Sequence, residues 1–267
     1  EGLAKCIEAR VENNTFEVNT VRRFASSLLI ESGKIKSVEN TNQYWDNVCI
    51  RAADEVLPII KQTWDAIIID EGQDFSDDEW LFVDELSKTC EYFWVFYDQR
   101  QAFWRDRALP HFLKEAFQCT LPTSYRCPEP IVNLADAYLG NPINLDLIKT
   151  AQKNGIISLV SCPNASAIRN KIENEINKLL GEGLSPSDIA ILILRGKAAI
   201  LDFRTIGCHK TVLCDDPTMT SNIVADGFLR FKGLERPAII IFGLELVNSA
   251  LGKRMYIALT RALTAVR

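Results

Sequence analysis

Apolar and polar residues divide the chain into two alternating kinds of segment. Short runs made almost wholly of apolar residues are typical of strands buried on both faces of a parallel sheet. They lie at 66–69, 92–97, 155–160, 188–194 and 238–245, and a strand-like segment lies at 15–20. Segments with apolar residues three or four positions apart predict helices, at 1–13, 21–32, 51–64, 77–89, 129–140, 167–183 and 254–266. The helix over 51–64 is expected to be interrupted at Pro58.

Strands that alternate with helices predict an α/β fold, in which helices cover both faces of parallel sheets. The length of 267 residues fits one large domain or two ordinary ones. We expect the break between two blocks of elements near 115–125, which divides the chain into residues 1–118 and 119–267.

Acidic residues directly follow two of the apolar runs. Asp70 and Glu71 come after the run at 66–69, and Asp98 comes after the run at 92–97. In open parallel sheets, ligands bind just beyond the carboxyl ends of the strands. If these strands are neighbours, the acids line one crevice. A pair of carboxylates there suits a hard cation such as Mg²⁺ and an activated water.

A helix cap is the alternative explanation for the polar residues of this segment. Ser76 followed by Glu79 has the spacing of a capping box at the start of the helix over 77–89. This explains Ser76 and Glu79. It does not explain Gln73, Asp74 or the two acids at the strand end.

Five segments of the chain carry a resemblance to a known family. They are IIIDEGQD (67–74), VFYDQRQAFW (95–104), LPTSYRCPEPI (121–131), RFKGLERPAIII (230–241) and MYIALTRA (255–262). In this order they resemble motifs II to VI of superfamily 1 helicases of the UvrD/Rep kind. The segment EVNTVRRFASSLL (17–29) loosely resembles the T-F-H segment of the same family. The resemblance covers roughly residues 15–265, and it is closest to the compact members that often carry a nuclease-related N-terminal domain.

The resemblance implies two RecA-like P-loop NTPase lobes with parallel sheets, the first of them incomplete here. In the first lobe, Asp70 and Glu71 would hold Mg²⁺ on the nucleotide, and Glu71 would also act as the general base. Gln73 and Gln101 would sense the γ-phosphate of ATP or relay its presence.

In the second lobe, the resemblance makes Arg126 and Arg261 arginine fingers that reach the nucleotide across a cleft between the lobes. Gly233 and Glu235 would contact the nucleotide from the same side. The alternatives remain open for three of these residues. Arg126 would otherwise be a surface salt bridge, Arg261 part of the solvated face of an amphipathic helix, and Gly233 a turn glycine.

Nucleic-acid contact is expected where aromatic and basic residues mix just after motif III. The residues of this segment are Phe103, Trp104, Arg100, Arg105 and Arg107. Aromatic stacking beside basic residues is how proteins hold single strands. The alternative is a hydrophobic corner in which Trp104 packs under the sheet. Arg22 and Arg23 are a weaker candidate.

The chain departs from the family pattern in several places. Tyr97, Ser124, Gly227 and Leu229 stand where the family usually has Gly, Asn, Thr and His. No G-x-x-x-x-G-K-[ST] loop occurs anywhere in the sequence. In the family that loop precedes the T-F-H segment, so we expect it on a missing N-terminal segment of the same protein. The first residue is Glu1 rather than Met, which favours a fragment over a naturally truncated relative.

Composition narrows the possibilities only a little. The formal net charge is −5 and the pI is about 5.3, so the overall charge does not indicate nucleic-acid binding. No apolar run is long enough to cross a membrane, and no signal peptide is visible. None of the eight cysteines forms a C-x-x-C pair, which favours a reduced, cytoplasmic protein. A metal site could be imagined at Cys208, His209 and Cys214. We favour the alternative that these are ordinary residues near a strand, because zinc sites usually have four ligands in two tight pairs.

The sequence thus predicts an ATP-dependent DNA helicase or translocase that acts on single-stranded or partly duplex DNA and is inactive as this chain alone. The alternative is a non-enzymatic module that binds nucleic acid or protein with the lobes retained. A third possibility is an unrelated α/β hydrolytic enzyme with Asp70 and Glu71 as metal ligands. That class favours a histidine cluster, whereas the chain contains only His111 and His209.

Overall fold

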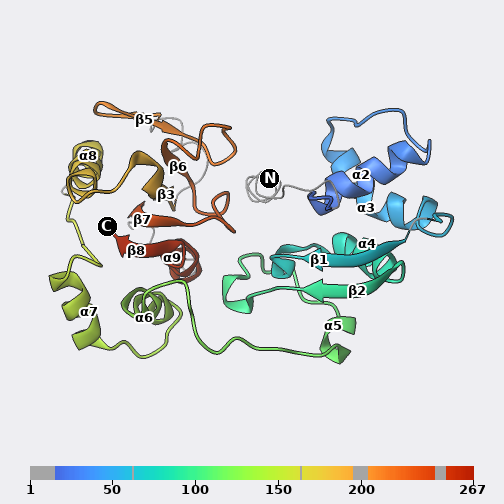
Figure 1. The fold of residues 1–267 in the computed structure, drawn as a ribbon, viewed down its shortest axis with the longest axis horizontal. Coiled ribbons are helices and arrows are strands. Elements are labelled where there is room, and N and C mark those ends of the chain that lie inside the picture. The colour runs from blue at the N-terminus through green and yellow to red at the C-terminus, as the bar shows by residue number, and fades with distance from the viewer. Residues whose placement is uncertain (1–15, 62, 163, 195–203, 244–250) are drawn as a thin grey trace. The chain divides into compact units, whose positions relative to one another are not determined.

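The computed structural model describes residues 16–61, 63–162, 164–194, 204–243 and 251–267. These residues divide into two compact units, one ending at Cys119 and the other beginning at Thr120 (Figure 1). We call them the N-terminal unit and the C-terminal unit. The helix predicted over 1–13 lies outside the described residues.

The N-terminal unit is built from three main helices and two strands. In chain order they are α2 (Val21–Glu31), α3 (Asn42–Glu55), β1 (Trp64–Ile69), α4 (Asp77–Ser87), β2 (Cys90–Val95) and the short α5 (Phe112–Glu115). The helices at 21–32 and 77–89 and both strands are confirmed. The helix predicted over 51–64 is wrong in extent, because it begins after the N-cap Thr41 and ends at Glu55, before Pro58. The strand predicted over 15–20 is also wrong, since residues 16–20 form no strand.

Strands β1 and β2 run parallel and cover a hydrophobic core with one face only. Ile67 pairs with Phe93 and Ile69 with Val95, and these side chains pack on the core formed by α2, α3 and α4. The residues between them point the other way. On that face Ile68 is 62% exposed and Trp94 is 58% exposed. The prediction that these strands are buried on both faces is therefore wrong, because helices cover only one side of this two-stranded sheet among the described residues.

The C-terminal unit contains a curled six-stranded sheet. Its strands are β3 (Ile189–Ile193), β4 (Thr205–Ile206), β5 (His209–Val212), β6 (Ile223–Gly227), β7 (Arg236–Phe242) and β8 (Ala262–Val266). The order across the sheet is β4-β5-β6-β3-β7-β8, and every pair is parallel except β4 with β5. The helices of this unit are α6 (Glu129–Tyr138), α7 (Leu145–Lys153), α8 (Ala165–Gly181) and α9 (Leu251–Leu259).

Helices cover both faces of this larger sheet. Ile172 and Ile176 of α8 pack on one face, against Ile191 and Ile240. Helix α9 contacts strands β7 and β8 and packs beside α6 (Figure 1). Every residue of β3 is buried. The prediction of an apolar strand buried on both faces is confirmed here.

Two further predictions in the C-terminal unit are wrong. The apolar run at 155–160 forms only an isolated bridge, between Ile157 and Val266. The single helix predicted over 254–266 is instead helix α9 followed by strand β8. Helix α9 ends at Leu259, where the Thr260 hydroxyl donates to the carbonyl of Tyr256 at 2.9 Å, and residues 262–266 pair with β7 as a strand. The protein is thus α/β with mostly parallel sheets, as predicted. None of the described helices is long and apolar enough to cross a membrane.

Candidate functional site

The carboxyl ends of β1 and β2 lie side by side, so the segments that follow them meet. The carbonyl of Ile69 accepts a hydrogen bond from the Phe96 N–H at 2.8 Å, and the carbonyl of Phe96 accepts one from the Gly72 N–H at 3.0 Å. This ladder carries Glu71 and Asp98 to the same edge of the sheet. The predicted convergence of the two acidic segments is confirmed.

Gln73 joins these two segments from within. Its side chain is buried, its Nε2 donates to Glu71 Oε2 at 2.5 Å, and its Oε1 accepts the N–H of Asp98 at 2.9 Å. Both ends of the amide are therefore used inside the N-terminal unit. In this arrangement Gln73 braces the two strand ends against each other, and its sensing of a phosphate stays a prediction.

Glu71 has an unusual backbone conformation. Its φ is 56° and its ψ is 38°, the left-handed helical region, and it is the one non-glycine residue with positive φ in the described ranges. Such a conformation costs a glutamate about 1 kcal/mol or more, and it persists where surrounding contacts hold it. Here the next residue cannot easily carry a side chain, since a Cβ on Gly72 would lie 2.9 Å from Val95 Cγ1. The tight turn aims the Glu71 carboxylate toward Gln73.

The other polar residues of this edge hold the loop after β2. Asp98 accepts the Arg100 N–H at 2.9 Å through Oδ1 and the Gln101 side-chain amide at 3.1 Å through Oδ2. Gln101 is buried. Asp70 is exposed, and its Oδ1 accepts the N–H of Glu71 at 2.8 Å. Gln101 is thus a scaffold residue of this loop, while Asp70 presents a carboxylate at the surface.

The acidic edge does not form a complete metal cage among the described residues. In the described ranges, no three His, Cys, Asp or Glu side chains group closely enough to hold a metal ion. Mg²⁺ keeps several waters and commonly takes one or two carboxylates together with phosphate oxygens. Mg²⁺ binding by the carboxylates of Asp70 and Glu71 stays a prediction. A triphosphate also needs a cradle of backbone amides, and the sequence has no phosphate loop to provide it.

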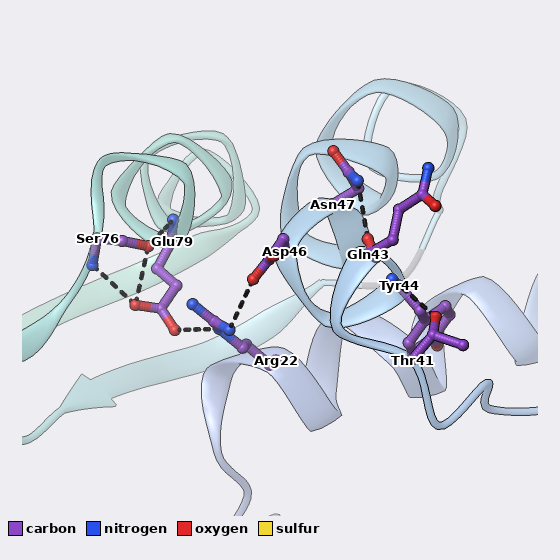
Figure 2. A network of polar contacts seen from close by, with 8 residues as sticks. All are labelled: Arg22, Thr41, Gln43, Tyr44, Asp46, Asn47, Ser76 and Glu79. Carbon is purple, nitrogen blue, oxygen red and sulfur yellow. Dashed lines mark hydrogen bonds and ion pairs between the residues drawn. The ribbon is translucent and has the colours of Figure 1, made fainter.

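Figure 2 shows how the helix after the acidic edge is anchored. Ser76 caps α4, and the predicted capping box with Glu79 is confirmed. Glu79 Oε2 accepts the Ser76 N–H at 2.8 Å, and its Oε1 accepts Arg22 Nε at 2.8 Å. Arg22 also lies 3.9 Å from Asp46 of α3. Arg22 therefore ties α2, α3 and α4 together, which argues against it as a nucleic-acid contact.

The predicted nucleic-acid segment forms an aromatic corner at the surface. The rings of Phe103 and Trp104 meet edge to face, 5.3 Å apart, and the Arg107 guanidinium lies 5.1 Å from the Trp104 ring centre. Arg107 also donates to the carbonyl of Asp74. Trp104 is 42% exposed and Arg105 is exposed. Trp104 thus lies at the surface and not under the sheet.

In the C-terminal unit, three segments meet at the end of helix α9. Arg126 pairs with Glu235, Nη1 to Oε2 at 3.1 Å, and its Nη2 lies 3.4 Å from the carbonyl of Thr260. Arg126 is more than a hundred positions away from both Glu235 and Thr260 along the chain. A guanidinium is favoured there, because the last carbonyls of a helix carry partial negative charge. The Arg126 side chain is about half exposed, so the guanidinium forms an ion pair with Glu235 and is still accessible to solvent.

Arg261 lies at the same helix end but is buried. It is 1% exposed, and its Nε donates to the carbonyl of Ile257 at 3.1 Å while its Nη2 donates to Thr260 Oγ1 at 3.1 Å. It follows the helix rather than lying on a solvated face, so that alternative is wrong. The guanidinium turns back on its own helix. This differs from the extended finger that the family resemblance implies.

The remaining predicted residue of this cluster is a turn glycine. Gly233 has a φ of 80°, a conformation that side chains rarely adopt. It turns the chain just before Glu235 and the start of β7. Beside the two arginines, Cys127 is buried, and burial raises the pKa of its thiol to about 11.

Among the residues that the structure describes, Cys208, His209 and Cys214 form no group that could hold a metal ion. Cys208 is exposed, His209 shares a hydrogen bond of 2.8 Å with Asn177, and Cys214 is buried with its thiol donating to the carbonyl of Arg230. No sequence pattern pointed to the polar residues that surround Cys214. Its N–H donates to the fully buried Asp226, which also pairs with Arg230 at 3.1 Å.

No family model matches the chain, and no curated protein matches it.

Proposed function

We propose that this chain belongs to an ATP-dependent DNA translocase of the UvrD/Rep kind. Within that protein it would be the part that responds to the nucleotide. One observation carries the proposal: in each unit, residues selected by separate motif resemblances come together. Gln73 joins Glu71 to Asp98 in the N-terminal unit. Arg126 joins Glu235 to the end of α9 in the C-terminal unit. If the motif matches were due to chance, their key residues would not be expected to come together in both units.

Each group would have a defined task in such a protein. Asp70 and Glu71 would hold Mg²⁺, which would offset negative charge on the phosphates when bound. The turn at Glu71 would fix its carboxylate to accept a proton from water. Arg126, the more accessible guanidinium, would bring positive charge to the phosphoryl oxygens, and Arg261 would hold the shape of the helix end on which Arg126 rests.

We expect weak nucleotide binding and no appreciable ATP hydrolysis from this chain, because it lacks the phosphate cradle. The test is an NMR titration of the ¹⁵N-labelled chain with millimolar Mg·ATP, with an ATPase assay on the same sample. Magnesium-dependent shifts should appear at the amides of Glu71 and Asp98 and at Thr260. Arg126→Gln should reduce the shift at Thr260. Absence of shifts at all three amides, or rapid hydrolysis, would contradict this assignment.

The aromatic corner would stack bases of a single strand. Fluorescence anisotropy with labelled oligo(dT) tests this directly. Because stacking contributes roughly 1–3 kcal/mol per base, Trp104→Ala should weaken binding by about 5- to 100-fold, and Trp104→Phe should weaken it less. Phe117→Ala is the matched control, since Phe117 is an exposed aromatic of the same unit outside the corner. Equal losses from Trp104→Ala and Phe117→Ala would argue against stacking at this site.

The second candidate is a non-enzymatic module that binds nucleic acid or protein and keeps the lobes. The internal use of Gln73 and the burial of Arg261 favour it, because both side chains serve the fold. The two candidates separate in the titration. A module of this kind would bind oligo(dT) through Trp104 with no Mg·ATP shifts at Glu71 or Thr260.

A further inference from the structure

A small pocket lies beside the carboxyl end of β2 in the N-terminal unit. Its volume is about 300 Å³, at the small end of the range for ligand pockets. The loop after β2, helix α5 and the segment after α5 supply its lining, which consists of Tyr97, Gln99, Leu109, Leu113, Lys114 and Gln118. We call it the loop pocket. All of these residues belong to one compact unit.

One wall of the loop pocket is apolar and is held in place by hydrogen bonds. The Tyr97 hydroxyl donates to Gln118 Oε1 at 2.7 Å, and Gln118 Nε2 donates to the carbonyl of Leu113 at 2.6 Å. Leu113 is buried, and Leu109 packs on the core of the unit. Tyr97 stands where the UvrD/Rep kind usually has glycine, so its ring adds a surface that a glycine would not provide.

Two exposed polar side chains line the same pocket and are available to a ligand. Neither the Gln99 amide nor the Lys114 ammonium makes a hydrogen bond or an ion pair with another described residue. Asp98, which precedes Gln99, has its charge offset by Arg100, Nε to Oδ1 at 3.4 Å. The pocket thus combines an apolar surface with one free amide and one free cation.

The loop pocket and the aromatic corner are parts of one loop. Gln99 begins the short 3₁₀ turn Gln99–Gln101, which leads directly to Phe103 and Trp104. Arg107, whose guanidinium lies 5.1 Å from the Trp104 ring centre, precedes the pocket residue Leu109 by two positions. Two residues of chain span at most about 7 Å. A single strand stacked on Trp104 therefore lies within reach of the pocket.

We propose that the loop pocket takes the nucleotide next to the one that stacks on Trp104. Its base lies on the two leucines against the Tyr97 ring, and the Gln99 amide bonds to the polar edge of the base. The Lys114 ammonium contacts a phosphate oxygen. An apolar ligand of the same size would leave both polar groups unused. This inference rests on the proposed binding of single strands and adds a second contact to it.

The test begins with an NMR titration of the ¹⁵N-labelled chain with oligo(dT). We expect shifts at the amides of Gln99, Leu109 and Lys114 and at the Trp104 indole. In Trp104→Ala the three amide shifts should persist at higher oligo(dT) concentration, because the pocket makes its own contacts.

Fluorescence anisotropy at several salt concentrations then separates the phosphate contact from the base contact. One phosphate contact on a single strand contributes about 0.7 to the slope of log affinity against log salt. Lys114→Ala should therefore lower that slope by about 0.7 and weaken binding about fivefold near 0.1 M salt. Gln99→Ala should weaken binding and leave the slope unchanged. Lys36→Ala is the matched control, since Lys36 is another exposed lysine of the same unit, and it should change neither quantity.

The outcomes distinguish the pocket from the aromatic corner. Shifts at the Trp104 indole without shifts at the three pocket amides would overturn the pocket and leave the stacking in place. Shifts at the pocket amides alone would support the pocket and contradict the stacking, and no shifts at either place would contradict both. Equal salt slopes for Lys114→Ala and Lys36→Ala would also overturn the inference. So would inorganic phosphate that reproduces the Lys114 shift while oligo(dT) leaves Gln99 and Leu109 unmoved, because the pocket would then take an anion only.

Discussion

The capping network of α4 allows a stability prediction to be worked out from its individual contacts. Replacing Glu79 by alanine removes three hydrogen bonds. They are the bonds from the Ser76 N–H at 2.8 Å, the Ser76 hydroxyl at 3.1 Å and Arg22 Nε at 2.8 Å. The capping contribution is about 1 kcal/mol. The bond to Arg22 involves a partly exposed side chain, so we discount it for solvent screening to about 1 kcal/mol. Together Glu79→Ala should lower the free energy of unfolding of the N-terminal unit by about 2 kcal/mol.

Tryptophan fluorescence reports this change selectively. All five tryptophans of the chain lie before residue 119, and none follows it. In urea, with a slope of about 2 kcal/mol per molar, the transition seen by fluorescence should shift down by about 1 M. Glu79→Gln should cost roughly half as much, about 1 kcal/mol, because its amide oxygen still accepts from Ser76 while the charge facing Arg22 is lost.

Asp78→Ala supplies the control for charge in the first turn. Asp78 is an exposed acid beside Glu79 in the same helix turn. Its removal should cost no more than about 0.5 kcal/mol through the helix dipole. Two results would refute the reasoning: an unfolding free energy of Glu79→Ala within about 0.5 kcal/mol of the parent, or an equal loss from Asp78→Ala.

Two further predictions follow from the C-terminal cluster and the buried thiols. Arg261→Ala should destabilise the C-terminal unit by about 2–4 kcal/mol, because it empties a buried, hydrogen-bonded site. Arg126→Ala should cost about 1 kcal/mol or less, because that side chain is about half exposed. Circular dichroism in urea measures both losses, and equal losses would contradict the observed difference in burial. Burial raises the pKa of Cys49 to about 12, that of Cys127 to about 11 and that of Cys214 to about 12. Because only the thiolate reacts and a raised pKa leaves it scarce at neutral pH, these thiols should alkylate at least about a hundredfold more slowly than ordinary exposed ones at pH 8. Intact-mass analysis after iodoacetamide treatment measures this, with the chain unfolded in urea as the control; a buried thiol that reacts as fast as Cys119 in the folded chain would contradict it.

The parts of the fold that could be predicted are those in which the local sequence pattern agrees with the burial and pairing of the folded segment. Residues 189–194 of the run 188–194 are continuously apolar, and β3 is buried on both faces. The acids after 66–69 and 92–97 met because both runs became adjacent parallel strands. The spacing of Ser76 and Glu79 was enough for the cap, since that motif depends only on residues within one helical turn.

Predictions failed where distant partners decide the local structure. Residues 262–266 suit a helix or a strand, and pairing with β7 makes them a strand. The apolar residues Ile68 and Trp94 do not reveal that only one face of their sheet is covered. For Arg261 the sequence pattern did not reveal the burial, because nothing in a single helix pattern tells which arginine folds back onto its own carbonyls.

The uncovered side of β1 and β2 has a consequence for how the N-terminal unit behaves in water. Tyr92, Trp94 and Phe96 stand beside Ile68 on a narrow ribbon with few charges between them. Two such ribbons brought together would release ordered water from both, so contact between molecules is favoured over dispersal. Because this attraction is apolar and acts between molecules, dilution should weaken it.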